Sequence, residues 1–225
     1  MKKFFFMFLF CFCYAALFSD NADIEYPVSS SFFPLNLGNV LYYKGYKTGE
    51  PEKLLKIRAD VASIENVEGV DDVISGYAGG SKETAKYDIV STGRTGHAES
   101  ILITYDPARI SYAQLLKIFF SVAHDPTTLN RQGADVGSQY RSVIFYLNEE
   151  QKRVAEAYIR QLSAAHVFPK PIVTQVVPLD KFYMAEDYHQ NYAVQNRSNP
   201  YIVSVSDPKV AKLKKMYPGC VRKRK

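Results

Sequence analysis

The sequence predicts an α+β fold in which helices and a sheet form a two-layer sandwich. Stretches typical of strands and of helices follow one another in mixed order, and the connections between them are short. The clearest helical stretch, which follows Asn148, has one apolar face and therefore needs a second layer to cover it. The chain has 225 residues, 47% of them hydrophobic, and this size and composition suit a single domain with one core.

The first half of this domain is predicted to contain one helix and two strands. Residues 59–67 fit a short helix that Gly69 ends. Residues 70–77 fit a strand, and the glycine pair that follows breaks it. Residues 100–105 alternate between apolar and polar types well enough for a second strand, which an Asp-Pro pair stops.

The second half is predicted to contain two helices and two strands. Ser111 is a good N-cap for a helix that carries leucines and phenylalanines on one face. Residues 141–147 fit a third strand. Asn148 then caps the clearest helix, and Gln151 stands where it could close a capping box. Residues 172–177 fit a fourth strand.

The N-terminus is typical of a secretory signal. Lys2 and Lys3 precede an apolar run over residues 4–18, which is too short to span a bilayer comfortably. A membrane anchor that stays uncleaved is the alternative, and we expect a secreted protein. Pro, Gly and Ser then recur without a clear period as far as Pro51. The predicted division is signal peptide 1–19, loosely structured lead-in segment 20–53, domain 54–200 and basic C-terminal tail 201–225.

The positive net charge of +5 belongs mainly to the tail. From Lys209 to the end the chain has eight Lys and Arg residues and no acidic one. The domain itself is therefore acidic, which argues against a nucleic-acid-binding surface on it. The tail could contact an anionic partner or simply form the solvated end of a helix.

Cysteine use is sparse. Cys11 and Cys13 lie in the predicted signal, so the mature chain keeps Cys220 alone and cannot form an internal disulfide. Cys220 is either a free thiol or the partner of a thiol on another molecule.

Three segments look unlike plain core. Residues 93–99 place two glycines before Glu99 at the start of a strand, where burial would raise the pKa of its carboxyl and let it donate a proton. A capping carboxylate beside a turn is the alternative. Residues 124–142 form a long polar loop that offers Asp135 and Tyr140 as hydrogen-bonding groups. Residues 182–190 are rich in aromatic and carboxylate side chains and could also be a packed lid.

A metal site is not expected. His97, His124 and His189 are the candidates for zinc ligands, but no two of them stand at a recognised ligand spacing.

These segments together resemble the A-type peptide methionine sulfoxide reductases, in that family's order and approximate spacing, from about Val61 to Asn196. So many motifs in register make the resemblance specific. The matching motifs are Gly76-Tyr77-Ala78-Gly79-Gly80, Ser91-Thr92-Gly93-Arg94-Thr95-Gly96-His97-Ala98-Glu99, Tyr105-Asp106-Pro107, His124-Asp125-Pro126, Leu129-Asn130-Arg131-Gln132-Gly133, Gln139-Tyr140-Arg141-Ser142 and Ala185-Glu186-Asp187-Tyr188-His189-Gln190.

The resemblance implies a ferredoxin-like α/β sandwich with extended loops that reduces the S epimer of methionine sulfoxide in proteins. In that family a cysteine thiolate attacks the sulfoxide sulfur while a glutamic acid and two tyrosines donate hydrogen bonds to the oxygen. By position Glu99 is the acid, Tyr87 and Tyr140 are the tyrosines, and Asp135 is a nearby carboxylate. The oxygen leaves as water and the cysteine becomes a sulfenic acid. A second thiol and then thioredoxin, or another thiol reductant, restore it without any further cofactor. We expect oxidised proteins as partners and a monomeric chain.

The chain departs from the family at the nucleophile. The family has Gly-Cys-Phe-Trp there, and counting back from Gly69 places Lys56 where the cysteine belongs. The aromatic pair becomes Ile57 and Arg58, and the preceding strand, normally apolar, is expected to be disrupted by charged residues and Pro51. A lysine cannot form a sulfenic acid.

Two explanations of this departure are open. One is an altered gene product, with a faulty exon or frame joined just before Val61. The other is a genuine relative without catalytic activity, which either binds methionine sulfoxide without reducing it or acts as a secreted interaction protein through its basic tail.

Overall fold

The structure is a computed structural model that describes the backbone of residues 52–57 and the whole of residues 64–222. The predicted signal peptide, nearly all of the lead-in segment and most of the helix predicted over residues 59–67 lie outside the described residues.

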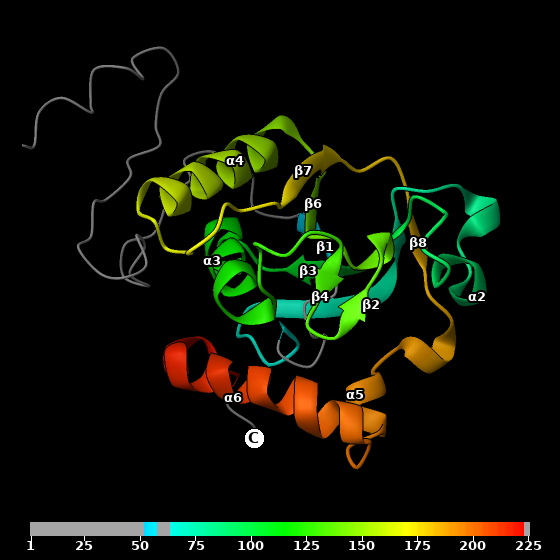
Figure 1. Ribbon diagram of the computed structural model, residues 1–225. Coiled ribbons are helices and arrows are strands. Elements are labelled where there is room, and N and C mark those ends of the chain that lie inside the picture. Colours follow the sequence, from blue (N-terminus) through cyan, green and yellow to red (C-terminus); the bar gives the residue numbers. More distant parts are fainter. Residues whose placement is uncertain (1–51, 58–63, 223–225) are drawn as a thin grey trace, which may run out of the picture.

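A six-stranded sheet in the order β7-β6-β1-β3-β2-β8 forms one layer of the fold (Figure 1). All neighbouring strands are antiparallel except β6 and β7, which are parallel and joined through a long helix. The strands are β1 (Glu52–Ile57), β2 (Val70–Ala78), β3 (Ala98–Tyr105), β6 (Val143–Tyr146), β7 (Gln175–Pro178) and β8 (Phe182–Met184). This mixture of strands and helices confirms the α+β class.

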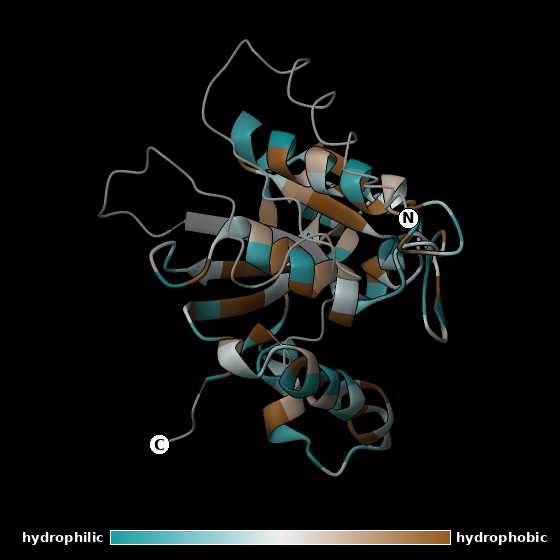
Figure 2. Ribbon diagram, turned by 90° about the vertical axis from the view of Figure 1, so that its left-hand side faces the viewer, coloured by the Kyte–Doolittle hydropathy of each residue, from teal (hydrophilic) through white to brown (hydrophobic). Residues whose placement is uncertain are grey.

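Three helices form the second layer. They are α3 (Tyr112–Ile118), α4 (Glu149–Ala164) and α6 (Asp207–Met216), and Figure 1 shows them from top to bottom as α4, α3 and α6. A π-helical turn over Phe119–Ala123 continues α3. Brown and teal bands alternate along α4, the uppermost helix in Figure 2, because its buried apolar residues lie on one face. A face of this kind is stable only against another apolar surface.

The alternation of side chains along β3 supplies that surface. Ile101 and Ile103 are buried with Leu115 and Leu213 in the larger core, which lies between the sheet and the helices. Leu102, which points to the opposite side of the strand, packs against a second, smaller cluster. The two faces of the sheet therefore have separate cores.

Short elements connect this framework. The long polar loop contains a small hairpin, and the segment after β8 contains only short helical turns before α6. These elements are α2 (Tyr87–Val90), β4 (Arg131–Gln132), β5 (Asp135–Val136), α5 (Tyr192–Gln195), the 3-10 turns Lys82–Thr84, Ser138–Tyr140, Asp187–His189 and Pro218–Cys220, and the π-helical turn Ile202–Ser206.

Both helix starts predicted from Ser111 and Asn148 are confirmed. Ser111 also forms a complete capping box with Gln114, although only the N-cap itself was predicted. The capping box predicted for Gln151 is wrong. Its side-chain oxygen instead accepts the N–H of Leu147, one residue before the cap, at 2.9 Å.

Loss of the Ser111 cap should lower stability measurably. We expect Ser111→Ala to reduce the free energy of unfolding by about 1 kcal/mol, because the backbone N–H of Gln114 at the start of α3 loses its acceptor, the Ser111 hydroxyl. Thermal denaturation should show a melting temperature lower by roughly 2–4 °C. The same change at exposed Ser163, inside α4, should be neutral or slightly stabilising, since alanine favours helix. An equal loss for both variants would contradict the capping argument.

The strands agree with the predictions less closely. The expectation that charged residues disrupt the strand before Lys56 is wrong, because β1 lies in the middle of the sheet and pairs with both β3 and β6. Pairing on both sides outweighs the low strand propensity of its Glu and Lys residues. β7 begins at Gln175 rather than at residue 172, and the backbone of Val173 instead bonds to Pro126.

The C-terminal segment packs on the domain. In α6, Leu213 is fully buried in the larger core, and Tyr217 is buried just after the helix. The end of the chain bonds to the segment before β2: Cys220 accepts the Glu68 N–H at 2.8 Å and the Arg222 N–H donates to Asn66 at 2.7 Å. None of the helices within the described ranges is long and apolar enough to cross a membrane.

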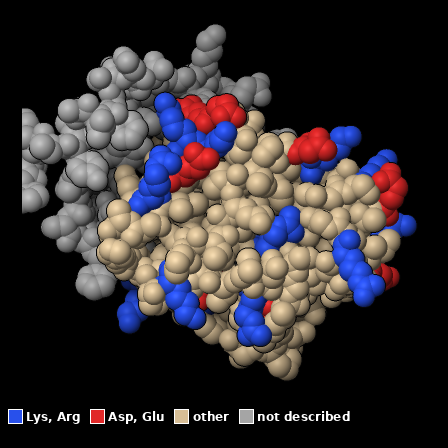
Figure 3. Space-filling model, turned by 45° about the horizontal axis from the view of Figure 1, so that its top comes forward, with Lys and Arg blue, Asp and Glu red and all other residues tan. Residues whose placement is uncertain are grey.

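Surface charge is mixed on the side of the molecule where α4 lies. Acidic and basic side chains are interspersed across the face seen in Figure 3. Three ion pairs follow α4 at helical spacing, between Lys152 and Glu149, Arg153 and Glu150, and Arg160 and Glu156. Such exposed pairs contribute little to stability.

Candidate functional site

A cavity of about 480 Å³ lies where the ends of β2 and β3 meet the C-terminal segment. The strands contribute Tyr77 and Glu99 to its lining, and α2 contributes Tyr87. Gln132 in the polar loop adds to the wall, and the C-terminal segment supplies much of the rest, including Tyr201 and Lys209. The cavity is therefore built from parts of the chain that are far apart in sequence.

Tyr77 and Glu99 lie side by side on the adjacent strands β2 and β3. They are register partners in the β2–β3 ladder, so their side chains project from the same face of adjacent strands. Tyr77 is buried and Glu99 is partly exposed. This pair brings a phenol and a carboxyl group together at the cavity wall.

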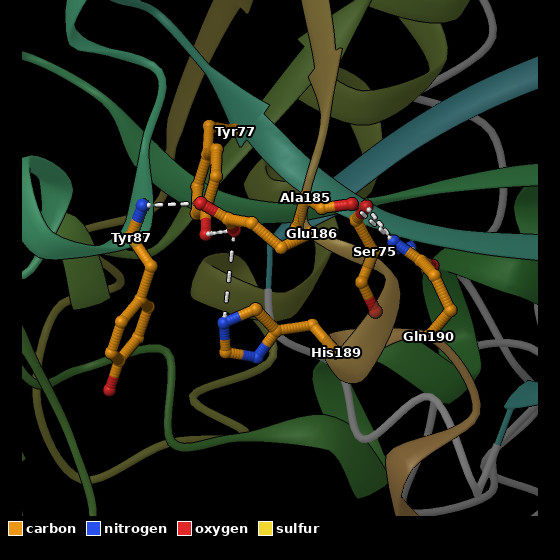
Figure 4. A network of polar contacts seen from close by, with 7 residues as sticks. All are labelled: Ser75, Tyr77, Tyr87, Ala185, Glu186, His189 and Gln190. Atoms are coloured by element: carbon orange, nitrogen blue, oxygen red, sulfur yellow. Dashed lines mark hydrogen bonds and ion pairs between the residues drawn. The ribbon is translucent and has the colours of Figure 1, made fainter.

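A network around Glu186 joins the strand β2 to the helix α2 (Figure 4). One carboxylate oxygen of Glu186 accepts the hydroxyl of Tyr77 at 2.8 Å. The other accepts the backbone N–H of Tyr87 at 2.9 Å. Nε2 of His189 lies 3.9 Å from the first oxygen, and the His189 ring lies against that of Tyr87 with centroids 4.7 Å apart.

These contacts shift the pKa values of Tyr77 and Glu186 in opposite directions. Burial, together with the hydrogen bond to Glu186, raises the pKa of the Tyr77 phenol well above its usual value, so it remains a donor. Burial alone would raise the pKa of Glu186. The hydrogen bonds from Tyr87 and from the Tyr77 hydroxyl outweigh that effect and lower it. The hydrogen bonds thus favour the ionised form of the Glu186 carboxylate.

The amide of Gln190 holds the same segment on β2. Its oxygen accepts the N–H of Ser75 at 2.9 Å, and its nitrogen donates to the carbonyls of Ser75 and Ala185 at 3.0 and 2.9 Å. The side chain thus continues the strand pairing beyond the end of β8 (Figure 4). Gln190 thus attaches residues 182–190, which were predicted to be either a functional segment or a packed lid, to the sheet.

The four side chains chosen from the sequence do not all meet in the cavity. Glu99 and Tyr87 line it, whereas Tyr140 and Asp135 are not among the described residues of its wall. Asp135 instead accepts the hydroxyl of Tyr201 at 3.1 Å. Because Tyr201 lines the cavity, Asp135 is linked to the site indirectly, through Tyr201.

The polar loop of Tyr140 packs directly on the glycine-containing turn before Glu99. Ser138 donates to the carbonyl of Gly93 at 2.6 Å, and the Gln139 amide donates to that of Ser91 at 2.9 Å. The guanidinium of Arg141 donates to the carbonyls of Gly96 and His97 at 2.9 and 3.1 Å. Two motifs that are separate in sequence therefore form one structural unit.

The histidines have other partners than a metal. His97 is buried and its Nε2 lies 2.9 Å from the carbonyl of Ser81, to which it donates. His124 Nε2 lies 2.7 Å from the hydroxyl of Ser142. Over residues 64–222 no three His, Cys, Asp or Glu side chains are grouped as metal ligands.

Sequence reasoning missed the roles of Tyr77, Glu186 and His189. All three stand in motifs that were noted, Gly76–Gly80 and Ala185–Gln190, but their contacts span about a hundred residues. The available signal was Glu186, which stands just before the aromatic-rich turn Asp187–His189. That signal did not show that Tyr77 would be its partner.

Comparison with known proteins identifies the framework that holds this site. A family model described as "Peptide methionine sulfoxide reductase" matches residues 60–219. The chain belongs to this reductase family. It is 53% identical over 156 residues to peptide methionine sulfoxide reductase MsrA 2 of Mesorhizobium japonicum, covering 69% of this chain and 80% of that protein. It is 54% identical over 156 residues to MsrA 2 of Synechocystis, covering 69% and 73%.

Solved structures of the reductase family are also similar. Mxr1 of Saccharomyces cerevisiae in its reduced form has a TM-score of 0.61 at 28% identity, with 69% of this chain and 91% of that chain covered. Methionine sulfoxide reductase A of Corynebacterium diphtheriae has a TM-score of 0.55 at 30% identity, with 78% and 89% covered.

The family match begins four residues after Lys56. The backbone of Lys56 pairs with Ile101 and Ile144, and that of Ile57 pairs with Ser100. Ser100 and Ile101 both line the cavity. The position at which reductases of this family are expected to carry their nucleophile is therefore one strand away from the cavity wall.

Cys220 is not among the described residues that line the cavity. It ends the 3-10 turn Pro218–Cys220, is half-buried and packs against the larger core. Burial raises the pKa of its thiol, an effect that the nearby Lys117 amine partly opposes. A thiol with a raised pKa is a weak nucleophile at neutral pH.

Proposed function

We propose that this fold serves the reaction of the reductase family, which is reduction of the S epimer of methionine sulfoxide in oxidised proteins. The observation that carries the proposal is the cavity that Glu99, Tyr77 and Tyr87 line together, one strand away from the backbone of Lys56. A ferredoxin-like arrangement is part of the proposal, and the central strand order β6-β1-β3-β2 supports it.

Glu99 and Tyr87 have the chemistry that a sulfoxide requires. The sulfoxide oxygen becomes more basic as the sulfur is attacked, so donors aimed at it stabilise the transition state. We assign Glu99 as the proton donor and Tyr87 as a hydrogen-bond donor from α2. Tyr140 and Asp135 complete the set by resemblance, through the loop that contacts the turn before Glu99.

The step that this chain cannot perform is the nucleophilic one. Reduction transfers two electrons to the sulfoxide, and the family takes them from a cysteine that becomes a sulfenic acid. An amine at position 56 offers no such reaction. The chain as written is proposed to recognise the sulfoxide without reducing it.

Two histories fit this loss. The start of the family match at residue 60 supports an altered gene product with a join just before Val61. The continuous pairing of β1 on both sides supports a genuine non-catalytic relative that binds methionine sulfoxide, because that segment takes its place in the sheet.

The setting is proposed from the sequence. The signal-like N-terminus favours a secreted protein. A monomer is proposed, with a domain that begins near residue 54 and includes the packed segment through Tyr217. For a form of this protein that carries the family's cysteine, we propose a thioredoxin-like protein or another thiol as the reductant.

Turnover tests the proposal. Residues 20–225 would be assayed with S and R epimers of a methionine sulfoxide peptide and dithiothreitol, beside Cys220→Ser. We expect no turnover above the dithiothreitol background, and binding of the S epimer in preference to the R epimer in calorimetry. S-specific turnover that disappears in Cys220→Ser would show that Cys220 is the nucleophile and contradict the proposal.

A further inference from the structure

Tyr87 stands on an element that cannot position it unaided. α2 has four residues, and its N-cap, Lys86, makes no side-chain hydrogen bond to the helix. A single helical turn is unstable on its own, because its few hydrogen bonds do not offset the entropy of fixing the backbone. The placement of the Tyr87 phenol in the cavity must therefore come from outside α2.

Glu186 supplies a contact of this kind. Its carboxylate accepts the Tyr87 N–H at 2.9 Å and the Tyr77 hydroxyl at 2.8 Å, so it bridges α2 to the strand that forms the cavity wall (Figure 4). Hydrogen bonds to an ionised carboxylate are among the stronger ones in proteins.

The same segment also holds the Tyr87 ring. The centroid of the His189 ring lies 4.7 Å from that of Tyr87, with the planes inclined by 50°. The Tyr188 ring lies against His189 in turn, with centroids 4.2 Å apart and planes inclined by 43°. The segment is itself fixed, because Gln190 bonds to Ser75 and Ala185 and the Ala185 N–H donates to the Ser75 carbonyl at 2.9 Å. Rigid support thus runs from β2 to Tyr87.

We propose that Glu186 is a positioning residue, whose carboxylate fixes α2 to β2 and thereby sets where the Tyr87 phenol meets a bound sulfoxide. This inference rests on the proposed function for its purpose, but the contact itself can be tested without any ligand. Glu186 is not among the described residues that line the cavity, so we expect it to act on a bound sulfoxide through the side chains it holds, Tyr87 above all.

The first test is nuclear magnetic resonance of residues 20–225. In the parent we expect ring-to-ring cross-peaks between Tyr87 and His189. The Tyr87 amide shift should also move with pH, at a midpoint below that of an ordinary glutamate. The groups that face the carboxylate are the Tyr77 hydroxyl, the His189 ring and the Tyr188 phenol, so their titrations would be recorded together.

Glu186→Ala should abolish both signals while the rest of the spectrum stays folded. Glu156→Ala is the matched control, since Glu156 is also a partly exposed carboxylate in an ion pair, on α4. Glu186→Gln keeps one acceptor oxygen and should retain part of the cross-peak intensity, and it is the variant to use if the alanine chain unfolds. Cross-peaks of unchanged intensity in a folded Glu186→Ala chain would overturn the proposal.

The second test is a double-mutant cycle on binding of the S-sulfoxide peptide. We expect Tyr87→Phe and Glu186→Ala each to weaken binding by roughly tenfold, and the double variant to be no weaker than Tyr87→Phe alone. Additive losses would overturn positioning through Tyr87. If the parent binds no sulfoxide peptide, the proposed function fails and the resonance experiment alone decides the role of Glu186.

Discussion

Replacing Lys56 by cysteine, with Ile57→Phe and Arg58→Trp, is expected to convert a chain without turnover into a reductase specific for the S epimer. The gain should be roughly 10³-fold or more over the parent, because removing the nucleophile of an enzyme commonly costs at least that much. The backbone of residues 56 and 57 pairs with Ile101 and Ser100 at the cavity wall, so the new cysteine would stand on the strand next to that wall. Rates with both epimers and dithiothreitol provide the measurement.

The control is the same triple variant with serine in place of cysteine. A hydroxyl has similar size but cannot take up the sulfoxide oxygen, so this variant should remain at the background. Equal turnover by the serine variant, or no gain in the cysteine variant despite a folded chain, would count against an intact scaffold that lacks only its nucleophile.

Gly76→Ala should cause the largest loss of stability among single substitutions near the site. A Cβ atom at Gly76 would stand 2.2 Å from Cζ of Phe182 and 2.3 Å from the carbonyl oxygen of Tyr183. The second contact is with backbone, which cannot rotate away, so β8 would have to separate from β2. We expect a loss of about 2–3 kcal/mol, seen as a melting temperature lower by roughly 5–10 °C.

Gly219→Ala provides the comparison, because a Cβ at Gly219 would meet nothing within 4 Å. It should change the free energy of unfolding by less than about 0.5 kcal/mol. Similar melting temperatures for the two variants would mean that β8 is not held closely against β2.

Local signals in the sequence were sufficient for much of the fold. Caps at Ser111 and Asn148, apolar periodicity and glycine breaks identified α3, α4, β2 and β3, because each depends on residues within a few positions. β1 was misjudged since its stability comes from pairing with two distant strands rather than from its own residues.

The site was predictable only in part. Glu99 and Tyr87, named through resemblance, both line one cavity, whereas the bridge from Glu186 to Tyr77 joins positions 109 residues apart and leaves no local pattern. The C-terminal wall was also obscured. Leu213 and Tyr217 are buried, but in the sequence they stand close to several lysines. The segment was therefore interpreted as a basic tail and its apolar face was not recognised.

The attachment of the chain's end to residues 66–68 has a consequence for how the protein matures. The bonds from Glu68 to Cys220 and from Arg222 to Asn66 join positions about 150 residues apart, and contacts of that separation form late. The partners of the β2–β3 ladder are much closer in sequence and can pair before those contacts form. We therefore expect the floor of the cavity to assemble early in folding and its C-terminal wall to close last.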